Sequence, residues 1–330
     1  MPVSPPFAVA LFGAGRIGAL HGRNAAAHPD LSLKYVVDPL GSAGERLALE
    51  LGAAPASTAE VLADPEVAGV IVASATDTHL ELCLRAAGAG KAIFCEKPID
   101  LDLARARAAA PALGHARLLI GFNRRFDPQF QALKSRLDAG AIGVLESLNI
   151  VSHDPAPPSI AYFESSGGLF RDMTIHDFDT ARWLLGEAPV EVFATASCLI
   201  DPAIAAAGDM DTAKVLLRTS SGRLCLISNS RRSGYGYDQR IEAFCSRGMA
   251  RAGNVTRSAL STWNEAGVLS DGLQNFFLDR YADAYRLEMD HFAQVIAGAA
   301  PRVSLADALT ALALADAAET SARTGAAVRV

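Results

Sequence analysis

The sequence predicts an α/β protein, in which a doubly wound parallel sheet is followed by an α+β domain with an open, largely antiparallel sheet. In the first part, short continuous apolar runs alternate with alanine-rich amphipathic stretches, as in buried parallel strands separated by helices. In the second part, apolar runs follow one another with short polar or glycine breaks, as in an antiparallel sheet. At 330 residues the chain has room for two domains, which we expect at residues 1–122 and 123–330.

The first part contains apolar runs that we interpret as strands, at residues 7–12, 33–37, 70–73, 92–95 and 118–120. The amphipathic stretches between them are predicted helices, at residues 19–27, 42–51, 78–89 and 101–113. Parallel strands of such a sheet share one carboxyl edge, where the ligands of doubly wound folds bind. We therefore expect a ligand site at the ends of these strands.

The second part begins with a predicted helix at 130–139, a strand at 145–151 and a rigid proline-rich loop at 154–158. A helix is predicted over residues 173–185, because apolar side chains share one face and Gly186 stands where a C-cap glycine belongs. Further strands are predicted at residues 190–197, 212–218, 223–231 and 238–245. Helical patterns predict two further helices, at residues 278–297 and 304–323. Whether the C-terminal helix packs against the first domain stays open.

The turn after the first strand carries the pattern Gly-x-Gly-x-x-Gly, and Asp38 follows the second strand. The first glycine permits a tight turn, the second lets the backbone approach a pyrophosphate, and the third lets the next helix pack closely. A carboxylate at the position of Asp38 accepts hydrogen bonds from the adenine ribose. The phosphates would lie at a helix N-terminus, which favours an anion, against Gly13, Gly15, Arg16, Ile17 and Gly18. The alternative is an α/β turn that merely needs glycine.

The expected cofactor is NAD rather than NADP. Asp38 would repel a 2′-phosphate, and Pro39 after it offers no backbone N–H to bind one.

Charge and composition exclude several classes of protein. The chain has 36 acidic and 30 basic side chains, and its arginine pairs at 124–125 and 231–232 form no basic stripe for a nucleic acid. No stretch is long and apolar enough to span a membrane, and residues 1–6 lack the regions of a signal peptide. The five cysteines are widely spaced and predict neither a zinc site nor a disulfide framework. We therefore expect a cytoplasmic protein.

Lys97 stands in the sequence Glu96-Lys97-Pro98, directly after the strand predicted at 92–95. The carboxyl end of a strand in this sheet would face the nicotinamide. A lysine there can hold a substrate hydroxyl and stabilise negative charge that develops on its oxygen. The alternative is an ordinary surface lysine before a turn.

Asp172 and His176 stand four residues apart, so a helix would place both on one face. A carboxylate beside a histidine can orient it, which suits a general base that takes a hydroxyl proton while hydride leaves the same carbon. The alternatives are a helix N-cap for Asp172 and a buried structural histidine for His176. No Cys or second His stands nearby at a ligand spacing, so we expect no metal.

Several polar residues after the first part could serve a polyol substrate, which needs convergent hydrogen-bond partners. They are Arg125, His153, Asp154, Tyr235 and Tyr237. The alternative is that all are ordinary surface residues, since their use depends on proximity to Lys97 and His176.

On these residues, the chain resembles the Gfo/Idh/MocA oxidoreductases over essentially its whole length. The resemblance is carried by residues 13–18, Asp38, Thr76-Asp77-Thr78-His79, Glu96-Lys97-Pro98 and the pair Asp172 and His176. Within the family, segments 121–128, 166–179 and 235–240 are most similar to bacterial inositol 2-dehydrogenases. His153 is a departure, because many relatives have arginine before the aspartate that is Asp154 here. This departure leaves open which ring the protein recognises as its substrate.

The resemblance implies a catalytic set of Lys97, Asp172 and His176, a cis peptide bond between Lys97 and Pro98, and a cofactor cleft lined by Thr76, His79, Glu96 and Lys97. The substrate set that it implies is Arg125, His153, Asp154, Asp172, His176 and Tyr235. The expected activity is NAD-dependent oxidation of a ring polyol, foremost of myo-inositol to its 2-keto form in inositol catabolism, by a homotetramer built on the open sheet. Another cyclitol or an aldose stays open as substrate, such as scyllo-inositol or a pyranose, and so does a regulator that binds NAD without turnover.

Overall fold

The computed structural model describes residues 6–330 and divides into two compact units. The first unit comprises the described residues up to Phe126 together with Ala284–Leu309, and the second comprises Asp127–Asp283 with Thr310–Val330. Residues 1–5, on which most of the expected absence of a signal peptide rests, lie outside the described residues. The assignment of separate roles to the predicted domains stays a prediction.

The first unit is built on a six-stranded parallel sheet in the order β3-β2-β1-β4-β5-β6. Its strands are β1 (Phe7–Phe12), β2 (Leu31–Val37), β3 (Ala54–Pro55), β4 (Val67–Val72), β5 (Ala92–Glu96) and β6 (Leu118–Gly121). The strand order reverses between β1 and β4, which is the switch point at which doubly wound sheets bind ligands. The predicted doubly wound parallel sheet is confirmed.

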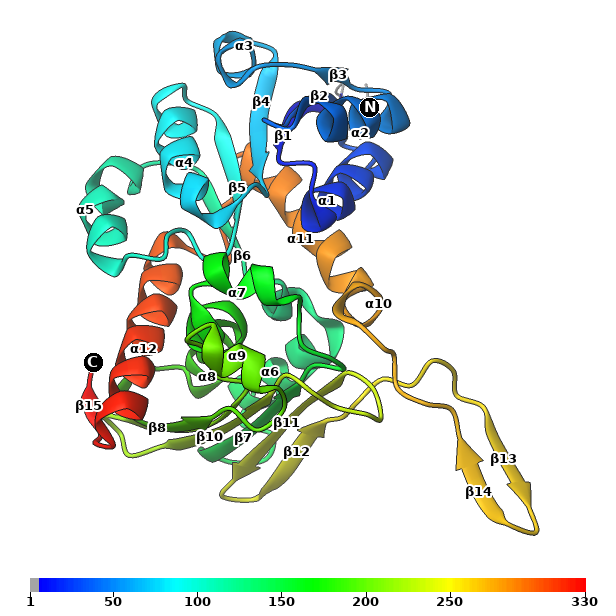
Figure 1. Ribbon diagram of the computed structural model, residues 1–330, viewed down its shortest axis with the longest axis vertical. Coiled ribbons are helices and arrows are strands. Elements are labelled where there is room, and N and C mark those ends of the chain that lie inside the picture. Colours follow the sequence, from blue (N-terminus) through cyan, green and yellow to red (C-terminus); the bar gives the residue numbers. More distant parts are fainter. Residues whose placement is uncertain (1–5) are drawn as a thin grey trace. The chain divides into compact units, whose positions relative to one another are not determined.

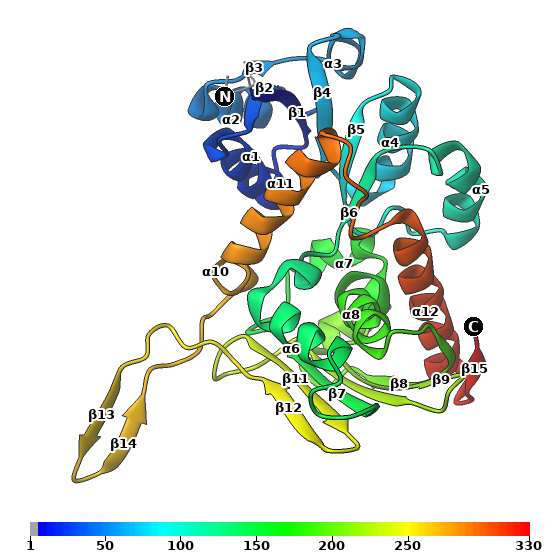
Figure 2. The ribbon, with the colours of Figure 1, turned by 180° about the vertical axis from the view of Figure 1, so that it is seen from behind.

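Helices cover both faces of this sheet. They are α1 (Arg16–Ala27), α2 (Gly41–Leu51), α3 (Thr58–Ala63), η1 (Thr76–Thr78), α4 (His79–Gly88), α5 (Leu103–Leu113), η2 (Asn123–Phe126) and α11 (Ala282–Ile296). In both ribbon views α4 and α5 lie on one side of the sheet and α1 and α11 on the other (Figures 1 and 2). Phe292 and Ile296 of α11 rest on Gly69 of β4, where a Cβ would lie 3.0 Å from each side chain. The late helix α11 thus completes the core of the first unit.

The second unit contains a seven-stranded sheet in the order β12-β11-β7-β10-β9-β8-β15. Its strands are β7 (Leu145–His153), β8 (Pro189–Ser197), β9 (Thr212–Thr219), β10 (Leu224–Ser230), β11 (Asp238–Cys245), β12 (Gly248–Ala252) and β15 (Val328–Arg329). The β7–β10 pair is parallel and the other neighbours are antiparallel, which confirms the predicted, largely antiparallel sheet. A separate hairpin, β13 (Ser261–Asn264) and β14 (Gly267–Ser270), projects from this unit (Figure 1).

Helices cover one face of this second sheet and leave the other open (Figures 1 and 2). The helical segments that lie wholly or mostly in this unit are α6 (Pro128–Asp138), α7 (Ile160–Ser166), η3 (Phe170–Thr174), α8 (Ile175–Leu185), α9 (Pro202–Ala206), α10 (Phe277–Arg280) and α12 (Leu305–Thr324). From Ala213 to Thr219, residues of β9 alternate between buried and exposed, as a sheet with one open face requires. No helix among residues 6–330 combines the length and the apolar character needed to cross a membrane.

Two predicted helices are wrong in detail. The helix predicted at 173–185 is α-helical only from Ile175, because η3 before it is a π-helical turn. In η3 the Thr174 hydroxyl donates to the Asn229 side-chain oxygen at 2.8 Å, a distant polar contact that apolar periodicity cannot reveal. Such π-helical turns frequently occur at functional sites. The helix predicted at 278–297 is interrupted at Tyr281, between α10 and α11.

Candidate active site

The glycine-rich turn between β1 and α1 has the geometry that a bound phosphate needs. Gly13 adopts φ +99°, a conformation that strains other residues. A Cβ at Gly18 would lie 2.1 Å from the Gly13 carbonyl oxygen, so any side chain there would push the helix away. At Gly15 a Cβ would have no heavy atom of the described residues within 4 Å, which leaves open space. Arg16 and Ile17 begin α1 next to this space. Their backbone N–H groups favour the binding of an anion there.

Asp38 follows β2 beside the glycine-rich turn. Its Oδ2 accepts a hydrogen bond from the backbone N–H of Ala14 at 2.6 Å, and its Oδ1 accepts one from Leu40 at 2.8 Å. Each carboxylate oxygen retains a second lone pair for a ribose hydroxyl. The residues present therefore fit a dinucleotide, with open space for phosphates at Gly15 and a fixed carboxylate for the ribose.

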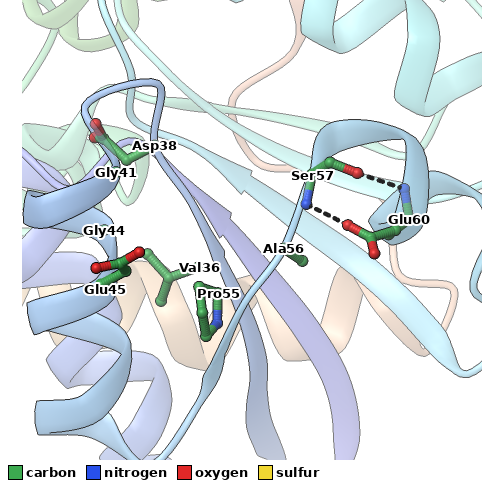
Figure 3. Close-up of a pocket in the computed structure, with 9 residues that line it drawn as sticks. All are labelled: Val36, Asp38, Gly41, Gly44, Glu45, Pro55, Ala56, Ser57 and Glu60. Carbon is green, nitrogen blue, oxygen red and sulfur yellow. Dashed lines mark hydrogen bonds between the residues drawn. The ribbon is translucent and has the colours of Figure 1, made fainter.

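A pocket next to Asp38 carries further negative charge (Figure 3). Its lining residues are Val36, Asp38, Gly41, Gly44, Glu45, Pro55, Ala56, Ser57 and Glu60. Ser57 and Glu60 exchange hydrogen bonds at the start of α3, and these bonds lower the pKa of Glu60. Three carboxylates, from Asp38, Glu45 and Glu60, thus line one pocket and oppose the binding of a phosphate there.

Thr76 and His79 lie just beyond β4, at the carboxyl edge of the first sheet. Thr76 begins η1 and is partly exposed, whereas His79 is only 2% exposed. The His79 Nδ1 atom lies 2.8 Å from the Pro98 carbonyl oxygen, and Nε2 lies 3.1 Å from that of Ser74. The ring therefore joins the loop after β4 to the loop after β5. Direct contact of either side chain with a cofactor stays a prediction.

Lys97 follows β5, and its peptide bond to Pro98 is cis, which confirms the expectation from the family. The buried Glu96 before it has Oε1 at 2.7 Å from Nε2 of His21, and its Oε2 accepts from the Lys97 backbone N–H at 3.2 Å. Burial acts to raise the pKa of Glu96, but the hydrogen bond and charge of His21, with the charge of Lys97, outweigh it and lower the pKa. A buried carboxylate thus supports the backbone at Lys97, and contact of Glu96 with the cofactor stays a prediction.

A second buried acid, Glu288 of α11, lies close enough to Glu96 for their charges to interact. Its side chain is fully buried, and neither carboxyl oxygen has a hydrogen-bond partner among residues 6–330. Burial raises the pKa of Glu288 well above its usual range, and the charge of Glu96 raises it further. The folded protein therefore favours the neutral form of Glu288.

Glu288→Gln should raise the melting temperature by an amount that grows with pH. The pKa of Glu288 is higher in the folded than in the unfolded chain, so its ionisation favours unfolding as pH rises above the unfolded value. The amide lacks this ionisation, and we expect a gain of roughly 2–4 °C at pH 7.5 that shrinks toward pH 5. Thermal unfolding across this range measures it, with the exposed Glu265→Gln as control. A pH-independent difference would contradict the assignment.

Asp172 lies in η3 and is held by two side chains of its own unit. Its Oδ2 accepts a hydrogen bond from Arg231 at 3.1 Å, and its Oδ1 accepts one from the Tyr162 hydroxyl at 2.8 Å. Burial, with the charge of Asp172, raises the pKa of Tyr162 far above its usual range, so the phenol keeps its proton. The Asp172 side chain remains 15% exposed, and its contact with a substrate hydroxyl stays a prediction.

His176 lies at the start of α8, on a segment anchored to the sheet. The next residue, Asp177, is fully buried and accepts hydrogen bonds from Ser152 and Asn229, each at 2.7 Å. These bonds tie the first turn of α8 to β7 and β10. The face that we expected Asp172 and His176 to share falls on a helical segment that is π-helical over residues 170–174 and α-helical from Ile175, and it stays a prediction. That Asp172 orients His176 stays a prediction.

His153 and Tyr235 converge on one buried carboxylate, Asp238. The Tyr235 hydroxyl donates to Asp238 Oδ2 at 2.6 Å, and His153 Nδ1 lies 4.0 Å from the same oxygen. Burial lowers the pKa of His153 and outweighs the Asp238 charge, which raises it. His153 stands opposite Asp238 in the register of β7 and β11, so His153 and Tyr235 both lie near one end of these two strands.

The remaining substrate candidates have structural partners. Asp154 continues from β7, and its backbone N–H donates to the Ser230 carbonyl at 2.9 Å. Tyr237 is 7% exposed and packs edge-on against Tyr281, with ring centroids 6.0 Å apart. In the first unit the buried Arg125 pairs with Asp307 at 3.1 Å. Substrate contacts of these residues stay predictions.

Sequence reasoning missed the residues that hold the candidate groups, namely Tyr162, Asp209, Arg231 and Asp238. One signal was available for Arg231, a charged side chain that ends an apolar run predicted as a strand. No pattern near Tyr162 or Asp209 indicated a role. Within residues 6–330, no three His, Cys, Asp or Glu side chains come together as a metal site requires, and the five cysteines are free.

Family models match both parts of the chain. A model described as the oxidoreductase family, NAD-binding Rossmann fold, matches residues 7–121. A model described as the GFO/IDH/MocA C-terminal domain matches residues 130–251. The match and the turn geometry together identify the first unit as an NAD-binding Rossmann domain.

Individual proteins match along nearly the whole chain. An inositol 2-dehydrogenase from Rhizobium meliloti (strain 1021) is 47% identical over 311 residues, which cover 93% of this chain and 94% of that protein. The structure of a myo-inositol dehydrogenase from Corynebacterium glutamicum has a TM-score of 0.94 at 44% identity, covering 98% of this chain and 99% of that one. A scyllo-inositol dehydrogenase from Lactobacillus casei, solved with NAD(H) and scyllo-inositol, has a TM-score of 0.92 at 26% identity and covers 98% and 99%.

Asp38→Ala should weaken NADH binding by roughly 10- to 100-fold, the effect of losing hydrogen bonds to a charged group. Fluorescence titration with NADH and NADPH measures both affinities. Glu45→Ala, a carboxylate of the same pocket, should leave NADH binding within about twofold. Tighter binding of NADPH than NADH by the unaltered protein would contradict this role of Asp38 and direct attention to Arg46.

Proposed function

Since the chain belongs to the Gfo/Idh/MocA family of oxidoreductases, we propose that it oxidises a ring polyol with NAD, and that the substrate is myo-inositol, converted to its 2-keto form. The observation that carries the proposal is the 47% identity, along nearly the whole chain, to an inositol 2-dehydrogenase. The fixed and partly exposed Asp172 carboxylate supports it, because a polyol site needs acceptors that are held in place. A cytoplasmic location stays part of the proposal.

Two side chains act on the reacting hydroxyl, and a third binds a neighbouring hydroxyl. His176 takes its proton as general base. Lys97 donates a hydrogen bond to the same oxygen and stabilises the negative charge that develops there. Asp172 accepts a hydrogen bond from a neighbouring hydroxyl and so fixes the ring. When bound, NAD would supply the acceptor for the hydride that leaves the carbon carrying the reacting hydroxyl.

The remaining proposed contacts hold the two ligands. The N-terminus of α1 binds the phosphates of NAD and Asp38 binds its adenine ribose, with Thr76, His79 and Glu96 beside the cofactor. His153 and Tyr235, joined through Asp238, bind further hydroxyls of the polyol. Arg125 and Asp154 complete the proposed substrate set.

A substrate panel tests the proposal. Formation of reduced nicotinamide is followed with myo-inositol, scyllo-inositol, glucose and the acyclic sorbitol, each with saturating NAD. We expect the highest kcat/KM with myo-inositol and no turnover of sorbitol. A preference for scyllo-inositol or glucose would replace the substrate but keep the reaction. NAD binding without turnover of any polyol would favour a regulator.

We also propose a homotetramer in which the open face of the seven-stranded sheet packs on a second copy. This face carries exposed apolar side chains, from Phe193, Leu216, Leu226, Phe244 and Met249. In the strand register Phe193 stands opposite Leu216, and Leu216 opposite Leu226, so they form one apolar row. Apolar rows of this kind on a folded protein mark contact surfaces.

Leu226→Glu should break the proposed assembly. A carboxylate in the apolar row would be buried without a partner in the contact, which is strongly unfavourable. Light scattering coupled to size-exclusion chromatography should show a smaller species than the unaltered protein. Leu49→Glu, at an exposed position of α2 in the first unit, is the matched control and should leave the mass unchanged. An unchanged mass for Leu226→Glu would argue against this face.

A further inference from the structure

Arg231 is a buried cation next to the candidate site. It directly follows β10, and only 1% of its surface is exposed. Its backbone N–H donates to the Asp211 carbonyl at 2.8 Å, and its guanidinium lies 4.9 Å from the centroid of the Phe163 ring. A guanidinium stays charged at every working pH, so its burial requires nearby anions.

Two carboxylates balance this charge, and one of them is Asp172. Arg231 Nη1 donates to Asp172 Oδ2 at 3.1 Å, and Nη2 donates to Asp209 Oδ2 at 3.4 Å. Asp209 in turn accepts the backbone N–H groups of Leu169 at 2.9 Å and Met210 at 2.8 Å. Leu169 immediately precedes η3. The Arg231 guanidinium therefore connects two carboxylates at this turn. Asp209 binds the residue that precedes η3, and Asp172 lies within η3.

The planar guanidinium makes this connection directional. Its donors keep fixed angles, so one group can bridge two carboxylates in a defined geometry that a lysine ammonium does not reproduce. Tyr162 fixes the other oxygen of Asp172 by a hydrogen bond of 2.8 Å. With Oδ2 held by Arg231 and Oδ1 by Tyr162, the Asp172 carboxylate is fixed in one orientation.

We propose that Arg231 is a positioning residue, which fixes the Asp172 carboxylate in the orientation that receives a hydroxyl of the polyol. Arg231 itself touches neither substrate nor cofactor in this assignment. The inference rests on the proposed function, because it gives Asp172 a polyol to hold. Positioning of this kind acts on turnover, since a displaced acceptor leaves the reacting carbon misaligned.

Variants at position 231 test the inference by steady-state kinetics with the best polyol of the panel. R231K keeps the positive charge but loses the planar guanidinium with its fixed donors, and we expect kcat to fall about 10-fold or more. R231Q loses both the charge and the planar guanidinium, and its kcat should fall about 100-fold or more. Y162F removes one hydrogen bond, and its kcat should fall about 3- to 10-fold. NADH affinity, measured by fluorescence titration, should stay within about twofold in all three, because Asp38 and the glycine-rich turn belong to the other unit.

The neighbouring Arg232 provides a matched control, because it is exposed and R232Q should keep the kcat of the unaltered protein. Folding is checked by circular dichroism, and R231K and Y162F keep the test valid if R231Q does not fold. R231K and Y162F that fold, bind NADH and keep kcat within about twofold would overturn the inference while the proposed function stands. An unaltered protein that turns over no polyol would overturn the proposed function and this inference with it.

Discussion

His176→Ala should lower kcat with the best polyol by roughly 10²- to 10⁴-fold, the usual loss when a general base is removed. The proposed role of His176 is to take the hydroxyl proton as the carbon is oxidised, and alanine offers no acceptor. NADH affinity should be nearly unchanged, because the residues that fit the dinucleotide lie in the first unit and His176 lies in the second. Steady-state formation of reduced nicotinamide and fluorescence titration with NADH measure the two quantities.

The control for this prediction is His115→Ala, at an exposed position of the first unit, which should keep the activity of the unaltered protein. In the unaltered protein, kcat/KM should fall as the pH drops below neutrality, because the base must be unprotonated for alcohol oxidation. Near-normal turnover by His176→Ala would identify His176 as a structural residue. The proton acceptor would then be sought at Lys97 or in a bound water.

The core of the fold could be predicted because its signals are local. Continuous apolar runs identified the strands of the first sheet, and the glycine pattern identified the β1–α1 turn. Short elements gave no such signal: β3 has two residues, both exposed, so no apolar run marks it. The π-helical turn η3 was also beyond prediction, and its Thr174–Asn229 contact joins residues 55 positions apart.

In the candidate site, sequence reasoning identified side chains that could act in a reaction, but not the residues that bind these side chains. It paired Asp172 with His176 through helical spacing, but it gave no sign that Asp172 also accepts a hydrogen bond from Arg231, 59 positions away. Likewise Glu96 meets His21, 75 positions away, across the first unit. Partners of this kind depend on which strands become neighbours, and periodicity along the chain does not encode that order.

Each unit supports one of its proposed catalytic groups with hydrogen bonds between buried ionisable side chains. In the first unit, Glu96 bonds to His21 and to the Lys97 backbone. In the second, Arg231 bridges Asp172 and Asp209. Buried pairs contribute little net stability, because the loss of hydration offsets much of their attraction. Their use here is to hold a lysine and a carboxylate in fixed positions, as proposed for the reaction.

Lys97→Ala should be about as damaging as His176→Ala, with kcat lowered by roughly 10²- to 10⁴-fold. The proposed lysine holds the oxygen whose proton His176 removes, so each group has its full effect only when the other is present. The double variant should therefore lose far less activity than the product of the two single losses. All three variants are compared by kcat with the same polyol and saturating NAD.

Lys134→Ala is the matched control for this double-mutant comparison, because Lys134 lies on α6 in an ion pair with Asp138 and has no proposed part in the reaction. Combined with His176→Ala, it should add nothing to the loss, since distant and independent sites do not couple. If the losses from Lys97→Ala and His176→Ala instead multiply, the two groups act on separate steps. Lys97 would then hold the cofactor or a remote hydroxyl rather than the reacting oxygen.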